Sequence, residues 1–312
     1  MLRNIATYGF QIADHNEPGN PGGYTAPGCV LASPSWPSYP GNVAPIIEDY
    51  VFNWTRDAAI TMSAVLNQAP AQIPAQGASD LLASYVNFAS ICLASGGDIG
   101  QAHYTPEGAS TGSTDESDGP ALRILTILQG FAGLDGPTQT AARNVIAADL
   151  AYLLDNNRYQ NPTYNLWEDT SGQSIFARSV QLAALNQVIN LGPGLGIPVP
   201  PTAPAAATWL AQQLPSHWSD ADNYYVGILE PIRGGGDPPP RRTTRASIQS
   251  WRAYTEPASL LTIHGCSQRR RRSGRNGRNR RQPHIRSTPR TRVSRSGRAS
   301  AVTTEMNTAG GA

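Results

Sequence analysis

Six segments of this chain carry their apolar residues at the spacing of an α-helix, and the two-residue alternation of a β-strand is nearly absent. In one segment, apolar residues recur three or four positions apart: Leu81, Leu82, Tyr85, Phe88, Ile91 and Cys92. The pattern predicts helices over about residues 57–68, 78–94, 120–131, 137–155, 173–191 and 204–214. The sequence therefore predicts an all-α fold.

The third of these segments differs from the others. Between residues 122 and 131, apolar side chains cover nearly the whole helical circumference, which indicates a buried helix. Pro120 suits its first turn and Asp118 lies near its cap, while Pro204 suits the first turn of the sixth segment. A row of helices, some buried all round and some amphipathic, fits the alternating inner and outer helices of an α/α barrel.

A Trp beside two adjacent carboxylates marks a candidate sugar site. Residues 164–169 read YNLWED, and the apolar segment of the fifth helix follows at 174–176. The indole can stack on a pyranose ring, and partial burial against it can raise the pKa of Glu168 until it serves as a general acid. The alternative is a Trp packed in a helix cap with both acids solvated at the first turn.

Three further segments accompany this one. Residues 32–35 read ASPS, residues 50–57 read YVFNWTRD, and residues 118–123 read DGPALR. Together and in this order, the four segments resemble the ASPS, YxFxWTRD, DGPALRA and YDLWEE elements of the glucoamylases of glycoside hydrolase family fifteen. The resemblance extends from about residue 1 to about residue 237.

The resemblance implies a fold and an activity. Family members close twelve helices into an (α/α)6 barrel, of which this chain supplies about the first half, and they release glucose from the non-reducing ends of starch-like α-glucans with inversion. It also implies a single chain secreted without a cofactor or metal. This sequence, however, opens without the apolar region of a signal peptide, and no apolar run approaches the roughly 18 residues of a membrane span.

The resemblance also implies roles for individual residues. Glu168 matches the general acid, and the implied substrate contacts are Tyr50, Trp54, Arg56, Asp57, Trp167, Asp169 and Arg233. Arg56 and Asp57 would hold the hydroxyls of the terminal glucose, and Tyr50 would support the oxocarbenium-like transition state. The alternatives are a weak ion pair at a helix start for the former two, and plain core aromatics for Tyr50 and Trp54.

Two departures from the family pattern bear on activity. The family often carries WGRPQ just before DGPALRA, whereas here the stretch is acidic at residues 114–118, which we expect to be a solvated loop. No segment matches the family's general base, since Glu256 and Glu305 lie in unrelated surroundings. Without a base, water activation should fail, so we expect this chain to be inactive.

Other candidate sites are weaker. Cys29, Cys92 and Cys266 have neither metal spacing nor a disulfide framework, which indicates buried free thiols or at most one disulfide. The five His residues show no ligand spacing. Asn53 begins a glycosylation sequon that we expect to be too buried for use.

The charge of the chain changes sharply near Arg233. Residues 1–232 carry a net charge of −13 and residues 233–312 a net charge of +15, and the chain contains no Lys. One interpretation is an Arg-rich arm that binds nucleic acid or another polyanion, giving a non-catalytic protein with a binding tail. We favour a translation of the wrong reading frame, because Arg, Pro, Gly, Ala and Ser have GC-rich codons and the resemblance stops abruptly.

The region from 238 to 312 is expected to be disordered, because it is rich in Arg and too poor in large apolar residues to bury a core. Hydrogen exchange should therefore find no protected amides there. Slow exchange over a contiguous block of this region would contradict the prediction.

Overall fold

The computed structural model describes residues 4–7, 25–32, 51–68, 74–113, 115–166, 168 and 170–232. All of them belong to the first of two units of the chain, Met1–Gly265. The predictions for Tyr50, Trp167, Asp169 and Arg233, and for the tail from residue 238, lie outside the described residues.

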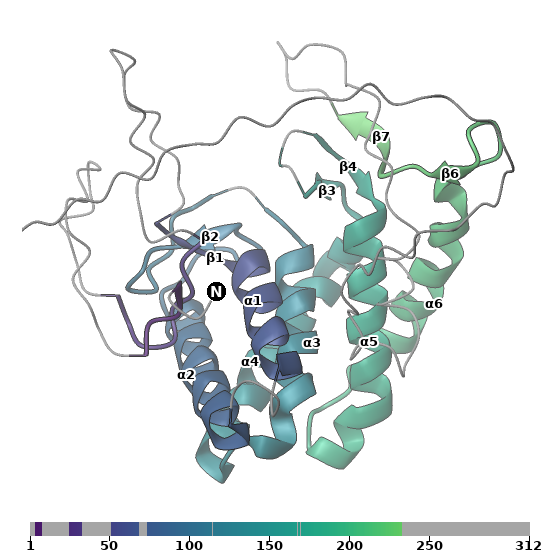
Figure 1. Cartoon of the computed structure of the whole chain (residues 1–312). Coiled ribbons are helices and arrows are strands. Elements are labelled where there is room, and N and C mark those ends of the chain that lie inside the picture. Colours follow the sequence, from purple (N-terminus) through teal and green to yellow (C-terminus); the bar gives the residue numbers. More distant parts are fainter. Residues whose placement is uncertain are drawn as a thin grey trace, which may run out of the picture. The chain divides into compact units, whose positions relative to one another are not determined.

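The six predicted helices are present (Figure 1). Their bounds are Thr55–Gln68 (α1), Ala75–Ala94 (α2), Asp118–Gly130 (α3), Gly136–Leu154 (α4), Ile175–Leu195 (α5) and Ala203–Gln213 (α6). The largest differences from prediction concern α5. It begins two residues later than expected, because residues up to Ser174 pair as a strand, and it continues through Pro193 to a left-handed cap at Gly196.

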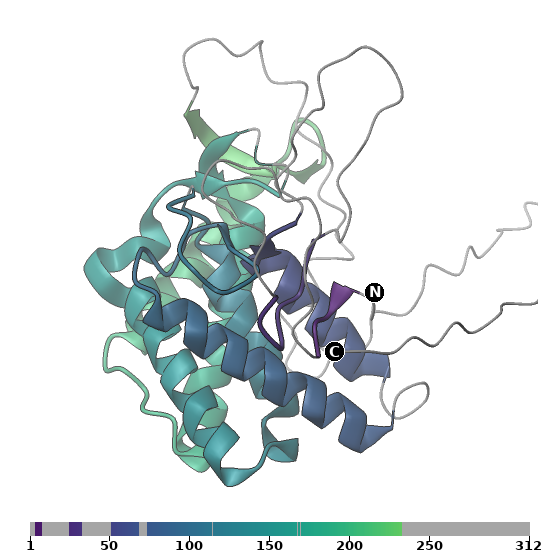
Figure 2. The ribbon, with the colours of Figure 1, turned by 90° about the vertical axis from the view of Figure 1, so that its left-hand side faces the viewer.

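The helices pack as two layers. In the first layer α3 lies between α1 and α5, while α4 packs on α3 and α2, and α6 packs on α5 (Figures 1 and 2). The central helix α3 is buried from Asp118 to Leu128, which confirms the prediction from its apolar circumference. Ile124 and Ile127 are fully buried, and side chains of this kind contribute about 1.5–3 kcal/mol each.

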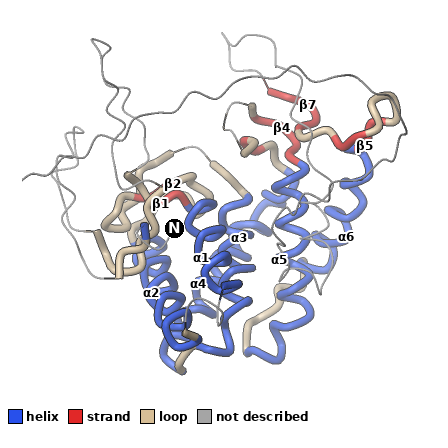
Figure 3. The backbone as a smooth tube through the Cα atoms, viewed as in Figure 1, coloured by secondary structure: helices blue, strands red, loops and turns tan. Residues whose placement is uncertain are grey.

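In the described part of the chain, seven short strands lie at one end of the helices (Figure 3). β1 (Asn53–Trp54) pairs with β2 (His103–Tyr104), and β5 (Trp218–Ser219) pairs with β6 (Tyr224–Tyr225). A three-stranded sheet contains β3 (Thr163–Tyr164), β4 (Ser171–Ser174) and β7 (Ile228–Ile232), in the order β3-β4-β7. Strands of two to five residues are too short to show an alternating pattern, and so no clear sign of them is visible in the sequence.

Two of the strands place helix starts at this end. β1 runs directly into α1, and β4 runs directly into α5, whose Ser174 hydroxyl accepts a hydrogen bond from the Ala177 N–H. A contact between Arg56 of α1 and Asp118 of α3 brings the start of α3 to the same place. The N-termini of the three helices of the first layer therefore meet.

Smaller expectations are also settled. Asn53 is buried and donates a hydrogen bond to the Val30 carbonyl, as expected for an unusable sequon. Cys29 and Cys92 are buried free thiols, while Cys266 lies outside the described residues. None of the described helices is both long and apolar enough to cross a membrane.

One ion pair lies inside the helical core. Arg123 of α3 donates to Asp149 of α4, with Nε 2.9 Å from Oδ2, and both side chains are almost completely inaccessible to solvent. Because a buried charge is costly without its partner, this pair ties α3 to α4 as long as both members are present.

Asp149→Asn should lower the free energy of unfolding by about 3–5 kcal/mol, because it leaves the Arg123 charge buried and unpaired. Urea unfolding measures the loss. Asp98→Asn is the matched control, since Asp98 pairs with Arg158 where both side chains are partly exposed, and its loss should stay below about 1 kcal/mol. Equal losses in the two variants would contradict the role of the buried pair.

Candidate active site

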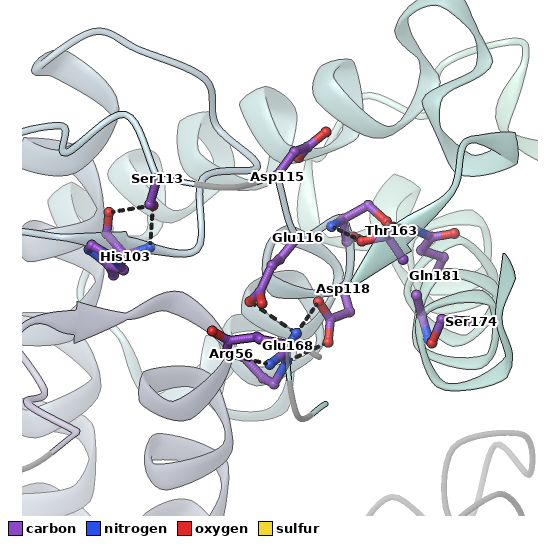
Figure 4. Close-up of polar contacts among 12 residues, drawn as sticks. Arg56, His103, Ser113, Asp115, Glu116, Asp118, Thr163, Glu168, Ser174 and Gln181 are labelled. Carbon is purple, nitrogen blue, oxygen red and sulfur yellow. Dashed lines mark hydrogen bonds and ion pairs between the residues drawn. The ribbon is translucent and has the colours of Figure 1, made fainter. Parts of the chain in front are cut away.

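A buried arginine lies where the helix N-termini meet. Arg56, in the first turn of α1, is only 4% exposed. Its Nε and Nη2 bind the two oxygens of Asp118 at 2.7 and 3.2 Å. Nη2 also lies 2.9 Å from Glu116, and Nη1 lies 3.4 Å from Glu168 (Figure 4). One guanidinium thus connects α1, the segment before α3, and the β3–β4 loop.

These contacts exclude one alternative and correct one expectation. Arg56 is not part of a weak ion pair at a helix start, because its contacts are nearly buried carboxylates from distant segments. The acidic stretch before α3 is not a solvated loop at Glu116 and Asp118, which are 2% and 1% exposed. Asp118 lies in the first turn of α3 as expected, but its carboxylate binds Arg56.

Glu116 and Asp118 were missed as site residues by the sequence analysis. The signal available was two acids within three residues, directly before a helix that is apolar all round. Acids at such a place need either solvent or a buried cation, and the first 232 residues contain few Arg. The sequence did not show which Arg reaches them.

Glu168 lies on the loop between β3 and β4. Its N–H donates to the Asn165 carbonyl, and the Asn165 N–H donates to the Thr170 carbonyl, which closes the loop. Glu168 has a φ of 56°, in the left-handed region that side-chain-bearing residues rarely adopt. Its side chain is 33% exposed, so it faces Arg56 on one side and solvent on the other. Strain of this kind is common at functional sites.

Burial favours the protonated forms of Glu116 and Glu168. Burial raises the pKa of Glu116 to about 8, and burial also raises the pKa of Glu168, while Arg56 opposes both shifts. A raised pKa favours the protonated form of a carboxyl, which is the form that a general acid requires. The arrangement can therefore deliver a proton from a partly exposed carboxyl.

Two further predicted residues lie beside this cluster. Asp57 follows Arg56 in α1, and its side chain is exposed. Trp54 is half-buried on β1, and its ring lies against His103 of β2 with centroids 4.6 Å apart. The structure therefore brings Trp54, Arg56, Asp57 and Glu168 to the same end of the helices. Within the described residues, no group of three His, Cys, Asp or Glu side chains could hold a metal ion.

A second buried arginine anchors the sheet that carries the Glu168 loop. Arg178 of α5 donates to the side-chain oxygen of Gln173 in β4 at 2.6 Å, and its Nη1 lies 3.0 Å from His217 Nε2. On the other side of the ring, Nδ1 lies 2.9 Å from the Val226 carbonyl. This arrangement requires a neutral His217 with its proton on Nδ1, since a second proton would face the guanidinium.

Comparisons with known proteins show the family to which the chain is similar. The family model for glycosyl hydrolases family 15 matches residues 22–228. The intracellular sporulation-specific glucoamylase of Saccharomyces cerevisiae is 25% identical over 193 residues, 53% of this chain and 32% of its own length. Glucoamylase-1 of Schizophyllum commune is 28% identical over 266 residues, 78% of this chain and 42% of its own.

Solved structures show the same fold. The glucoamylase of Saccharomycopsis fibuligera has a TM-score of 0.55 at 23% identity, covering 73% of this chain and 49% of that one. The enzyme of Hypocrea jecorina has a TM-score of 0.54 at 24% identity, covering 66% and 35%. Both are (α/α)6 barrels, so the expected fold class is confirmed. The chain spans less than half the length of these relatives.

The pH dependence of stability should reveal His217. Burial, and then Arg178, lower its pKa from 6.5 to about 4. Between these values the unfolded chain binds the extra proton and the folded chain does not, so the free energy of unfolding should fall as pH falls from about 6.5 to 4. Urea unfolding in this window should show a flatter dependence for His217→Asn. An unchanged slope in the variant would contradict the assignment.

Proposed function

The chain belongs to glycosyl hydrolases family 15, and we propose that its site is that of a glucoamylase, which releases glucose from the non-reducing ends of starch-type α-glucans with inversion. The observation that carries the proposal is Glu168. It is a carboxyl with a raised pKa, partly open to solvent, in a strained loop beside a buried arginine. The relatives named above are glucoamylases.

In this proposal Glu168 protonates the glycosidic oxygen as the bond breaks. The 33% exposure of its side chain lets the leaving oxygen approach, while burial of the rest raises its pKa and so favours the protonated form that a general acid needs. Arg56 then faces the carboxylate that remains, with Nη1 3.4 Å from Oε1. The charge that develops during proton transfer is thereby compensated.

The terminal glucose is proposed to lie over the start of α1. Asp57 is exposed there and can accept hydrogen bonds from sugar hydroxyls, and Trp54 offers part of an indole surface. Arg56 can contribute only through Nη1, since its other nitrogens face Asp118 and Glu116. Tyr50, Trp167, Asp169 and Arg233 remain proposed sugar contacts on the family resemblance alone.

Inversion also needs a carboxylate base, about 6.5–9.5 Å from the acid. Glu116 and Asp118 are unsuited to this role, because both are buried against Arg56 and closed to an attacking water. Asp57 is proposed to bind sugar instead. We therefore propose that the described residues hold the acid half of the mechanism, and that this chain by itself does not complete a turnover.

Location and partners follow the family. We propose a starch-like glucan as the partner and secretion as the destination, although the name of the Saccharomyces cerevisiae relative describes an intracellular enzyme. The alternative function, a polyanion-binding tail, rests on the +15 charge of residues 233–312. Binding to heparin that disappears when these residues are removed would favour it.

Binding of a substrate analogue should distinguish Asp57, the proposed sugar contact, from Glu168, the proposed general acid. Asp57→Ala should weaken binding of a non-hydrolysable maltose analogue by about 10- to 100-fold, because hydrogen bonds to a charged group contribute about 1.5–3 kcal/mol. Glu168→Gln should change the affinity by less than about threefold, since the amide keeps the shape of the acid. Isothermal titration calorimetry measures both variants, and Asp98→Asn, at an exposed pair, is the control. Equal weakening of the affinity by all three variants would contradict the role of Asp57 as a sugar contact.

The unsubstituted chain should show no turnover. With maltose or starch, the chain should release glucose no faster than a blank, because none of the described carboxylates of the site is suited to act as the base. Glucose release that Glu168→Gln abolishes would overturn this expectation, while it would support Glu168 as the acid.

A further inference from the structure

Glu116 is almost fully enclosed, yet it belongs to none of the family motifs and has no task in the proposed mechanism. Glu116 is 2% exposed, and its backbone N–H donates a hydrogen bond to the Gly100 carbonyl at 2.6 Å, which fixes the backbone at this position. The side chain points toward Arg56 and lies on the same side of it as Glu168 (Figure 4). An acid so placed either carries a buried charge or keeps a proton.

The contacts of Arg56 decide between these states. Asp118 accepts hydrogen bonds from Arg56 Nε and Nη2, and Glu168 accepts one from Nη1. Glu116 lies 2.9 Å from Nη2, but both of its oxygens are buried without an aligned hydrogen bond among the described residues. A carboxylate that shares one guanidinium with two other acids is costly to bury, whereas a neutral carboxyl is not.

Charge counting points the same way. Four carboxyls surround one guanidinium: Asp57 from α1, Glu116 and Asp118 from the start of α3, and Glu168 from the β3–β4 loop. Asp115 belongs to the same segment as Glu116 but bonds to the Tyr152 hydroxyl, away from this group. If all four were ionised, the site would hold a net charge of about −3 in a partly buried space, so at least one proton should stay.

We propose that Glu116 keeps its proton and acts as a positioning residue for Glu168, donating a hydrogen bond to it so that the two carboxyls titrate as one pair. The inference rests on the proposed function for its catalytic meaning, but the pairing itself does not. The raised pKa of Glu116, about 8, agrees with a retained proton.

The pairing gives Glu168 a defined partner as it loses its proton. The Glu168 carboxylate would be held by the Glu116 hydroxyl on one side and by Arg56 Nη1 on the other. Two donors already in place stabilise the developing charge without reorganisation. Above the pKa of Glu116 the hydroxyl is lost, and a second negative charge then opposes ionisation of Glu168.

The test is a titration of the full chain labelled with ¹³C at the Glu side-chain carboxyls, followed by NMR. In the unsubstituted protein, the Glu168 signal should move in two steps, the upper one near pH 8 together with Glu116. In Glu116→Gln, a change of the same shape that cannot ionise, the upper step at Glu168 should vanish. In Glu168→Gln, the Glu116 step should move to lower pH, because a neighbouring negative charge is removed.

Asp115→Asn is the matched control, since it removes a carboxyl one residue away that does not contact Arg56. The two-step curve should persist in it. A Glu116 signal that is already that of a carboxylate at pH 6, or a two-step Glu168 curve that persists in Glu116→Gln, would overturn the proposal. If Glu116→Gln does not fold, the unsubstituted protein and Glu168→Gln still decide the state of Glu116 and its coupling.

The outcome is independent of the proposed function. Coupled titration without binding of the maltose analogue would keep the pairing and remove the sugar site. Binding of the analogue with an ionised, uncoupled Glu116 would keep the sugar site and remove the pairing. A merely structural Glu116 would alter stability in Glu116→Gln but leave the Glu168 titration curve unchanged.

Discussion

The buried guanidinium of Arg56 is the interaction on which the site depends. It binds Asp118 through two nitrogens and faces Glu116 and Glu168 with the remaining N–H groups, at 2.7 to 3.4 Å. These acids come from positions 60 to about 110 residues away, so one side chain fixes the relative placement of α1, α3 and the β3–β4 loop. The flat, five-donor geometry of Arg allows this, whereas a Lys ammonium would offer a single point charge.

The helical layers explain why this happens at one end. α3 is apolar on all sides and lies between α1 and α5, so the starts of these helices are brought together. The N-terminus of a helix carries a partial positive charge and free N–H groups, which favours acids such as Asp118 there. The first turn of α1 then carries the exposed Asp57, and the β3–β4 loop on the rigid helical frame carries the partly exposed Glu168.

The site also shows how acids can serve different roles in one place. Asp118 is bound by two nitrogens of Arg56, Glu116 is enclosed with little compensation, and Glu168 is one-third exposed. Burial raises the pKa of Glu116 and of Glu168, so two simple carboxylic acids come to favour their protonated forms in this place. The comparison proteins share the fold and the family, and the acid-rich stretch before α3 is where this chain departs from the family pattern noted in its sequence.

The sequence by itself determined the six helices, the burial of α3 and the family, because helical periodicity and short motifs are local properties of the chain. It also predicted Glu168, Arg56, Asp57 and Trp54 as a set through their motifs. Only the tertiary structure decided that Glu116 and Asp118 are buried against Arg56, and that His217 and Arg178 support the sheet beside Glu168. Whether an acid is solvated or enclosed depends on which distant side chains surround it, and residue type and spacing alone do not specify those neighbours.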